Sequence, residues 1–204
     1  MTPEVIDAFD DFTDRFEGRV GYMYTDIYGL VTTGRGNLID PGARESLVGA
    51  SPSMALGLGW HRSTGDATIA TDEEVVEAYW AVKRAWPATQ STRCESLTSV
   101  RLYLSDINRL TAAKRTQLWT QLLGRFPDVD AWPSPAQLGL LSMAWAMGAY
   151  FAFPRFEEAA RAADWARCAA ECPIRDGSAA RNAANVELFL GAARGAPLSD
   201  VLPR

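Results

Sequence analysis

The chain has 204 residues, a formal net charge of −5, 48% hydrophobic residues and 22% charged residues, which is typical of a globular protein with a substantial core. It contains no run of lysines and arginines, which argues against a nucleic-acid partner because binding to phosphates needs clustered positive charge. No stretch is long and apolar enough to span a membrane, and the acidic start MTPEVIDAFDDFTD does not resemble a secretory signal.

The three cysteines and the single histidine limit the available chemistry. An odd number of cysteines in a chain of this size does not indicate a disulfide framework, so Cys94, Cys168 and Cys172 are expected to be free structural thiols in a reducing compartment. Cys168 and Cys172 are spaced to share a helix face. Because His61 is the one histidine, we nevertheless expect no metal site and no cofactor.

The first predicted element is a helix over residues 3–16. Apolar residues recur there at helical spacing, and Pro3 suits the first helical position. Glu17 lies at the end of this pattern, and Gly18, a residue type that commonly ends helices, follows it directly. We therefore expect the Glu17 carboxyl at the C-terminal end of the helix.

A β-hairpin is expected next. The residues 20–25 and 30–33 look like short strands on either side of a turn-rich segment that begins with Asp26. Gly34 and Gly36 come after the second strand, and two glycines so close together permit a tight bend or a close approach of the backbone to a ligand.

The middle of the chain has mixed signals. A short helix is expected around 53–58, and the segment GWHRSTGDATI, with His61, reads as a loop. Thr71 and Glu74 form a capping box that begins a helix through about residue 86, which Pro87 ends.

The remaining elements are all predicted to be helical. Two helices are expected at 96–109 and 111–125, and the most apolar helix begins at Ser134 and ends at Gly148. Three further helices follow, at 155–163, 165–170 and 179–190.

Glu17, Asp26 and Thr32 stand out as chemistry-bearing residues of the first forty. A carboxyl at a helix end, a carboxylate on a hairpin turn and a hydroxyl on the return strand can converge across one cleft. Glycoside hydrolysis needs such a set, because one carboxylic acid protonates the leaving oxygen while a second carboxylate orients or activates water.

The spacing Glu-x8-Asp-x5-Thr, within Tyr24-x-Asp26-x-x-Gly29-x-x-Thr32-x-Gly34-x-Gly36, resembles the T-even phage lysozyme family of peptidoglycan muramidases. The resemblance covers a little over half of the chain, roughly residues 3–40, 68–86 and 134–192. It implies an α+β, predominantly helical, lysozyme-like fold that forms one domain over 1–204. A small β-hairpin-containing lobe at about 15–70 would be joined by a connecting helix at 71–87 to a larger helical lobe, made of 88–204 and the N-terminal helix.

By this resemblance, Glu17 is the general acid, Asp26 orients the attacking water and Thr32 helps to hold that water. Thr33 is the competitor for the last role, but strand alternation places it on the opposite face from Thr32. For Asp26 an alternative remains, which is a purely structural role in an Asx-type turn before Gly29.

The resemblance also implies residues that bind or position the substrate: Arg181, Asn37, Leu38 and Trp145. Arg181 matches an arginine that pairs with the catalytic glutamate in the family, although a surface position on a helix is the alternative. Trp145 is a candidate for stacking on a sugar ring, but core packing is the stronger expectation.

The sequence departs from the family pattern at three positions. Asn37 stands where the family usually has histidine, so it supplies hydrogen bonds but no charge. Ser142 and Ala146 replace amides that commonly line the cleft in the family.

The expected function is therefore a monomeric muramidase that hydrolyses the β-1,4 bond between N-acetylmuramic acid and N-acetylglucosamine in bacterial peptidoglycan. It would be made in the cytoplasm without a signal peptide and act in the cell wall after release or injection. Such an enzyme is a phage endolysin or an injected antibacterial effector, and an effector implies a cognate immunity protein. The alternatives are a non-catalytic wall-binding or structural module of the same fold, and a lytic transglycosylase.

Overall fold

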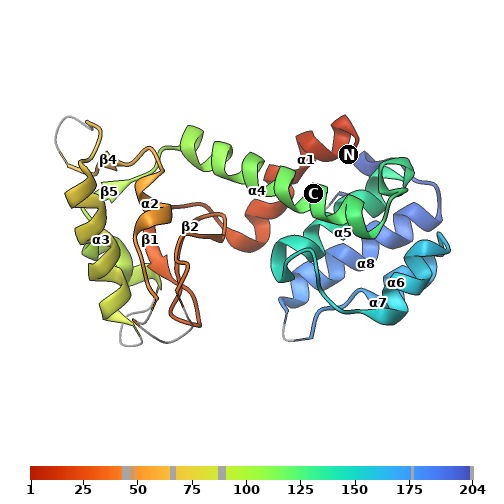
Figure 1. Ribbon diagram of the computed structural model, residues 1–204. Coiled ribbons are helices and arrows are strands. Elements are labelled where there is room, and N and C mark those ends of the chain that lie inside the picture. The colour runs from red at the N-terminus through yellow and green to blue at the C-terminus, as the bar shows by residue number, and fades with distance from the viewer. Residues whose placement is uncertain (43–46, 48, 65–67, 87–90, 176, 203–204) are drawn as a thin grey trace. The chain divides into compact units, whose positions relative to one another are not determined.

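The computed structural model describes every residue except 43–46, 48, 65–67, 87–90, 176 and 203–204. The fold is α+β and mostly helical, with a three-stranded antiparallel sheet near the N-terminus followed by a helical region (Figure 1). The chain divides into two compact units, one of residues 17–112 and one of residues 1–16 and 113–204. Each unit is described separately below.

The first sheet of unit 17–112 contains the predicted hairpin. Strand β1 (Val20–Thr25) pairs antiparallel with β2 (Val31–Gly34), and β2 pairs with a third strand, β3 (Asn37–Leu38). The two predicted strands are confirmed to within a residue. The third strand was not predicted, because two residues are too few to show an alternating pattern.

Unit 17–112 also contains helices α2 (Ser53–Leu56) and α3 (Asp72–Ala85). The capping box at the start of α3 is confirmed, since the Thr71 hydroxyl accepts a hydrogen bond from the Glu74 amide while the Glu74 side chain accepts one from the Thr71 amide. The predicted stop at Pro87 lies outside the described residues. The core of the unit consists of buried side chains from the hairpin, α3 and the segments around them: Met23, Val31, Ile39, Ala55, Trp60, Val75, Ala78, Tyr79, Val82, Cys94, Val100, Leu102 and Ile107.

The region between 58 and 125 differs most from prediction. His61 and Arg62 form strand β4 (His61–Arg62), which pairs with β5 (Val100–Arg101), where a loop and a helix were expected. A 3₁₀ helix, η1 (Ser91–Leu97), precedes β5. The two helices expected at 96–109 and 111–125 are in fact one helix, α4 (Leu104–Arg125). At the residue where the second helix was expected to begin, the Thr111 hydroxyl donates to the Ile107 carbonyl one turn back and does not cap a new helix.

The residues of α4 fall in both compact units, since one division lies between residues 112 and 113, and α1 crosses the other division at its last residue, Glu17. The helix expected at 71–87 is α3, and its role as a connecting helix stays a prediction. Its apolar face, with Val75, Tyr79 and Val82, is buried in the core of unit 17–112.

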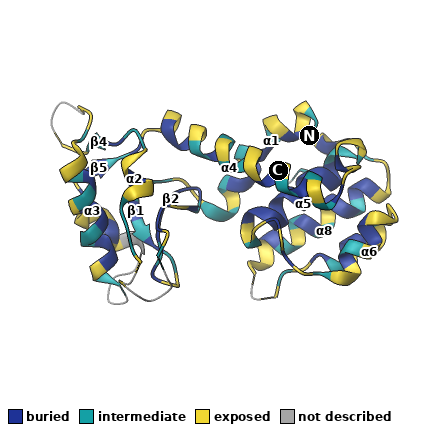
Figure 2. Ribbon diagram, in the orientation of Figure 1, coloured by how far each residue is buried: buried dark blue, intermediate teal, exposed yellow. Residues whose placement is uncertain are grey.

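The other unit is built of helices. Its predicted members are confirmed as α1 (Pro3–Glu17, which ends one residue past the unit's first segment), α5 (Ser134–Met147), α6 (Pro154–Arg161), α7 (Trp165–Glu171) and α8 (Ala179–Ala193), with η2 (Val129–Ala131) and α9 (Leu198–Val201) in addition. Helix α5 is buried along almost its whole length, as Figure 2 shows, and it packs against α8. Its near-continuous apolar sequence reflects this central position.

Candidate active site

The candidate acid, Glu17, is the last residue of α1, and Gly18 ends the helix with a left-handed backbone (φ 67°). The Glu17 side chain is half-buried and lies directly against Gly36: a Cβ placed on Gly36 would be 3.0 Å from Oε2 of Glu17. Gly36 also has a positive φ of 70°. The second glycine of the sequence motif therefore permits both the bend and the approach of the carboxyl group.

The turn that carries Gly36 is anchored by a buried arginine. Arg35 is only 2% exposed, and its Nη1 donates to Oδ1 of Asn108 and to Oγ1 of Thr111, both at 3.0 Å. These partners lie on α4. The turn is closed on its other side by Asn37, whose Oδ1 accepts a hydrogen bond from the Arg35 amide at 3.2 Å. Asn37 therefore positions the turn beside Glu17, using the hydrogen-bonding capacity that asparagine retains without a charge.

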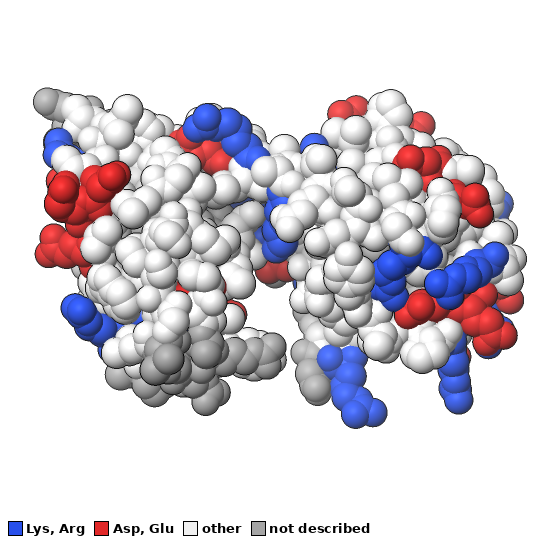
Figure 3. All heavy atoms as spheres, in the orientation of Figure 1, with Lys and Arg blue, Asp and Glu red and all other residues white. Residues whose placement is uncertain are grey.

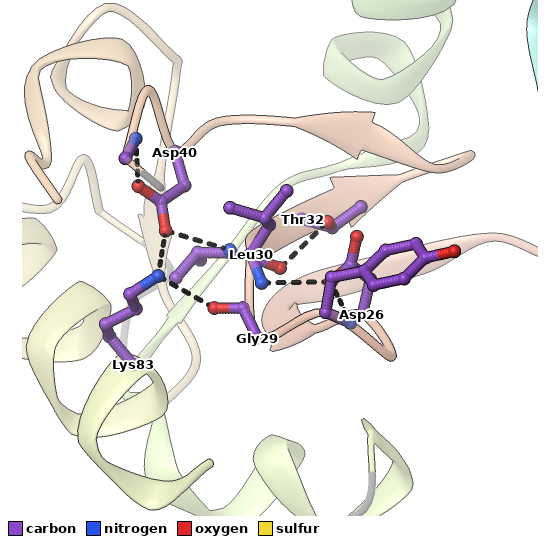
Figure 4. Close-up of polar contacts among 9 residues, drawn as sticks. Asp26, Gly29, Leu30, Thr32, Asp40 and Lys83 are labelled. Carbon is purple, nitrogen blue, oxygen red and sulfur yellow. Dashed lines mark hydrogen bonds and ion pairs between the residues drawn. The ribbon is translucent and has the colours of Figure 1, made fainter. Parts of the chain in front are cut away.

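Asp26 begins the hairpin turn and is held by the backbone of that turn. Its Oδ1 accepts hydrogen bonds from the amides of Tyr28 (2.8 Å) and Leu30 (2.9 Å), as Figure 4 shows. This is the Asx-type role considered as the alternative. This structural role uses only Oδ1 of Asp26, because no described residue makes a hydrogen bond to Oδ2. A structural role and a role for the second oxygen are thus compatible.

The register of the sheet separates the two threonines. Thr32 is the direct partner of Tyr24 on β1 and of Leu38 on β3, whereas Thr33 is opposite Asn37. Directly opposed residues point to the same face of a sheet, so Thr32, Tyr24 and Leu38 share one face. The Thr33 hydroxyl is taken up on the other face, where it donates to the Tyr22 carbonyl at 3.1 Å. The Thr32 hydroxyl donates to the Leu30 carbonyl, also at 3.1 Å.

Tyr24 connects the two candidate carboxyl groups electrostatically. Burial raises the pKa of its phenol well above the ordinary value, and the charges of Glu17 and Asp26 raise it further. Because both charges act on this one phenol, Glu17 and Asp26 both lie in the surroundings of Tyr24. Tyr24 was quoted in the sequence motif but not proposed as a site residue, and its position opposite Thr32 is the signal that would have identified it.

Two predicted site residues, Arg181 and Trp145, belong to the helical unit. Arg181, in the first turn of α8, is 9% exposed, and its guanidinium lies over the Phe16 ring at 5.2 Å. It is therefore buried and does not occupy the surface position considered as its alternative. Trp145 is 5% exposed, packs edge-on against Phe9 and has the Lys114 ammonium 4.0 Å from its ring centre, which agrees with the expected core packing.

Glu17, Asp26, Thr32, Asn37 and Leu38 all belong to unit 17–112, and Leu38 shares its face of the sheet with Thr32. The convergence of Glu17, Asp26 and Thr32 on one cleft stays a prediction. Leu38 is 46% exposed, whereas Thr32, its direct partner in the sheet, is only 5% exposed. Arg181 and Trp145 are in the other unit. A role for them beside Glu17 stays a prediction.

The wider surface and the cysteines add two observations. Figure 3 shows basic and acidic side chains interspersed on the helical unit, where ion pairs such as Arg167–Glu158 and Arg161–Glu157 occur. All three cysteines are buried free thiols. Among the described residues there is no group of three or more histidine, cysteine, aspartate or glutamate side chains placed to hold a metal ion, and no helix with the length and hydrophobicity to cross a membrane.

Comparison with protein-family models and with curated proteins gives no significant match for this chain. The case for a function therefore depends on the residues and their arrangement.

Proposed function

We propose that the protein is a peptidoglycan hydrolase with a lysozyme-like fold, a muramidase that cleaves the β-1,4 bond between N-acetylmuramic acid and N-acetylglucosamine. The observation that supports the proposal is the position of Tyr24, which is opposite Thr32 in the sheet and has the charges of both Glu17 and Asp26 in its surroundings, while Glu17, Asp26 and Thr32 have the sequence spacing of the phage-type muramidases. Two carboxyl groups with different surroundings suit the separate tasks of an acid and a water-orienting base.

In this proposal Glu17 is the general acid. Its carboxyl group is half-buried at the end of α1, against the backbone of Gly36. The glycine leaves room for the carboxyl, and the buried Arg35 fixes the turn behind it. Glu17 would donate its proton to the glycosidic oxygen as the bond to the leaving sugar breaks.

Asp26 and Thr32 would hold the attacking water. The turn amides orient Asp26 through Oδ1, which leaves Oδ2 to accept a hydrogen from water. The hydroxyl hydrogen of Thr32 is directed to the Leu30 carbonyl, so its oxygen can act only as an acceptor. Two acceptors for the two water hydrogens would leave a lone pair of the water for attack on the anomeric carbon, which is the inverting arrangement.

The test is digestion of purified sacculi, with mass spectrometry of the released fragments. The wild-type protein should release muropeptides with new reducing ends on muramic acid, and Glu17→Gln should lower the rate by about 10²- to 10⁴-fold, the usual contribution of a general acid. Asp11→Asn, which neutralises an exposed carboxylate on the same helix, is the matched control and should retain the wild-type rate.

Two other results would replace the proposal. Anhydromuramic ends in the products would indicate a lytic transglycosylase, which needs the acid but no activated water. A folded wild-type protein that co-sediments with sacculi and releases nothing would indicate a non-catalytic wall-binding module. If hydrolysis is observed, the next step is to test Arg181, Trp145 and Leu38 as substrate contacts.

A further inference from the structure

A buried lysine reaches the hairpin turn from helix α3. The Lys83 side chain is 3% exposed, and its Nζ donates to the carbonyl of Gly29 at 2.8 Å and to Oδ2 of Asp40 at 2.6 Å (Figure 4). Gly29 belongs to the same turn as Asp26. The lysine ammonium is thus joined directly to the segment that carries the candidate water-orienting residue.

Asp40 extends this connection to the second strand of the hairpin. Its side chain is fully buried, and besides Lys83 it accepts hydrogen bonds from the amides of Gly42 (2.8 Å) and Val31 (3.3 Å). Burial alone would raise the pKa of Asp40, but the Lys83 ammonium and these amides hold the pKa below its ordinary value. Asp40 therefore stays charged and keeps Lys83 paired.

Lys83 holds the segment between Asp26 and Thr32 at two points. One is the Gly29 carbonyl and the other, through Asp40, is the Val31 amide, so the two points flank Leu30. Gly29 itself has a positive φ of 75° and lies against the Trp86 ring, where a Cβ would be only 2.9 Å from the indole. The segment is therefore fixed from α3 by a charge and by an aromatic surface.

A buried ion pair is weak support for stability as such, because apolar residues of similar volume often replace one without loss. Positioning is the better explanation here, because two hydrogen bonds of this pair, to the Gly29 carbonyl and from the Val31 amide, are made with the backbone of the segment between Asp26 and Thr32. That turn's amides, Tyr28 and Leu30, hold Oδ1 of Asp26.

We propose that Lys83 is a positioning residue for Asp26: by fixing the Gly29 carbonyl directly and Val31 through Asp40, it sets the direction in which Oδ2 of Asp26 faces. The effect of Lys83 on the structure of the turn is independent of the proposed function. Its effect on catalysis depends on the muramidase assignment.

The test compares wild type with Lys83→Met and with the double variant Lys83→Met/Asp40→Asn, which avoids an unpaired buried charge. The first measurement is amide hydrogen exchange by NMR. Protection of the Tyr28 and Leu30 amides should fall at least tenfold more than protection of the Leu102 amide, which donates to the Gly21 carbonyl in the same unit. An equal fall at all three amides would show general destabilisation and overturn the proposal, as would unchanged protection.

Arg125→Met is the matched control. Arg125 also donates to two backbone carbonyls, those of Ala149 and Phe151, and to a carboxylate, Glu157, but in the helical unit. Its loss should lower the melting temperature and leave the relative protection of Tyr28 and Leu30 unchanged. A selective fall in the protection of the Tyr28 and Leu30 amides in Arg125→Met would overturn the proposal, because the effect would then not be specific to Lys83.

The second measurement is turnover of sacculi. If Lys83 positions Asp26, Lys83→Met/Asp40→Asn should lower kcat about tenfold or more while KM stays within about twofold, because water orientation and not substrate binding is impaired. A change in KM alone would contradict this role. If the wild type does not cleave sacculi, the proposed function fails, and the exchange measurement still decides whether Lys83 orders the Asp26 turn.

Discussion

Replacement of Gly36 by alanine tests whether the glycine turn places the Glu17 carboxyl. The new Cβ would lie 3.0 Å from Oε2 and 3.4 Å from Cδ of Glu17. Non-bonded heavy atoms prefer roughly 3.5 Å, so Glu17 must move on the order of 0.5 Å. The positive φ of Gly36 adds about 1–2 kcal/mol of backbone strain.

A shift of this size should be visible in catalysis. Because a misplacement of about 1 Å can cost about 10²-fold in rate, we expect Gly36→Ala to lower the turnover of sacculi roughly tenfold. Urea unfolding should show a loss of about 1–2 kcal/mol, which leaves most of the protein folded under assay conditions if its stability is ordinary.

Gly195→Ala is the control. Gly195 has a similar positive φ of 66°, so alanine is strained there in the same way, but nothing lies within 4 Å of its added Cβ and it belongs to the helical unit. The two variants should therefore lose similar stability, and only Gly36→Ala should lose turnover beyond the unfolded fraction. Equal loss of turnover in both variants, or full activity of Gly36→Ala, would refute the reasoning.

Three further predictions concern stability and thiol chemistry. Neither amide atom of the buried Asn185 has a hydrogen-bond partner within the described residues, so Asn185→Leu should raise the free energy of unfolding by about 1–3 kcal/mol in a urea titration. Burial raises the pKa of Cys168 and of Cys172 to about 12, so at pH 8 both thiols should react with a disulfide reagent only after denaturation, and rapid labelling of the native protein would contradict this. Because the pKa of Asp40 is lowered in the fold, its contribution to stability is complete above about pH 4 and is lost as the pH falls through the folded value. The loss of stability between pH 6 and pH 3 should accordingly be smaller in Lys83→Met/Asp40→Asn than in wild type.

The parts of the fold that were predicted correctly depend on local signals. The end of α1 at Glu17 follows from the glycine beside it, and the separation of Thr32 from Thr33 follows from the two-residue period of a strand. The capping box at Thr71 is likewise complete within four residues. In each case the physical cause lies within one turn or one strand pair, so the sequence alone contains it.

The parts that were missed depend on partners far away in the chain. The β4–β5 pair joins His61 to Arg101, and neither two-residue strand has a recognisable pattern by itself. The ion pair of Lys83 with Asp40 spans 43 residues. One signal for it was present: Lys83 falls four residues after Tyr79, on the apolar stripe of α3, where a charged residue must find a partner if it is buried.

The structure supports the two candidate carboxyl groups by separate means, and this leads to a last prediction. Gly36 and its turn act on Glu17, whereas Lys83 acts on the segment that holds Asp26. Changes to independent groups add in free energy, so the fold losses in turnover of Gly36→Ala and Lys83→Met should multiply in the double variant to within about twofold. A combined loss no greater than the larger single loss would mean that both substitutions disturb one shared arrangement. Turnover of the four proteins at a temperature where all are folded therefore distinguishes two independently held groups from a single coupled site.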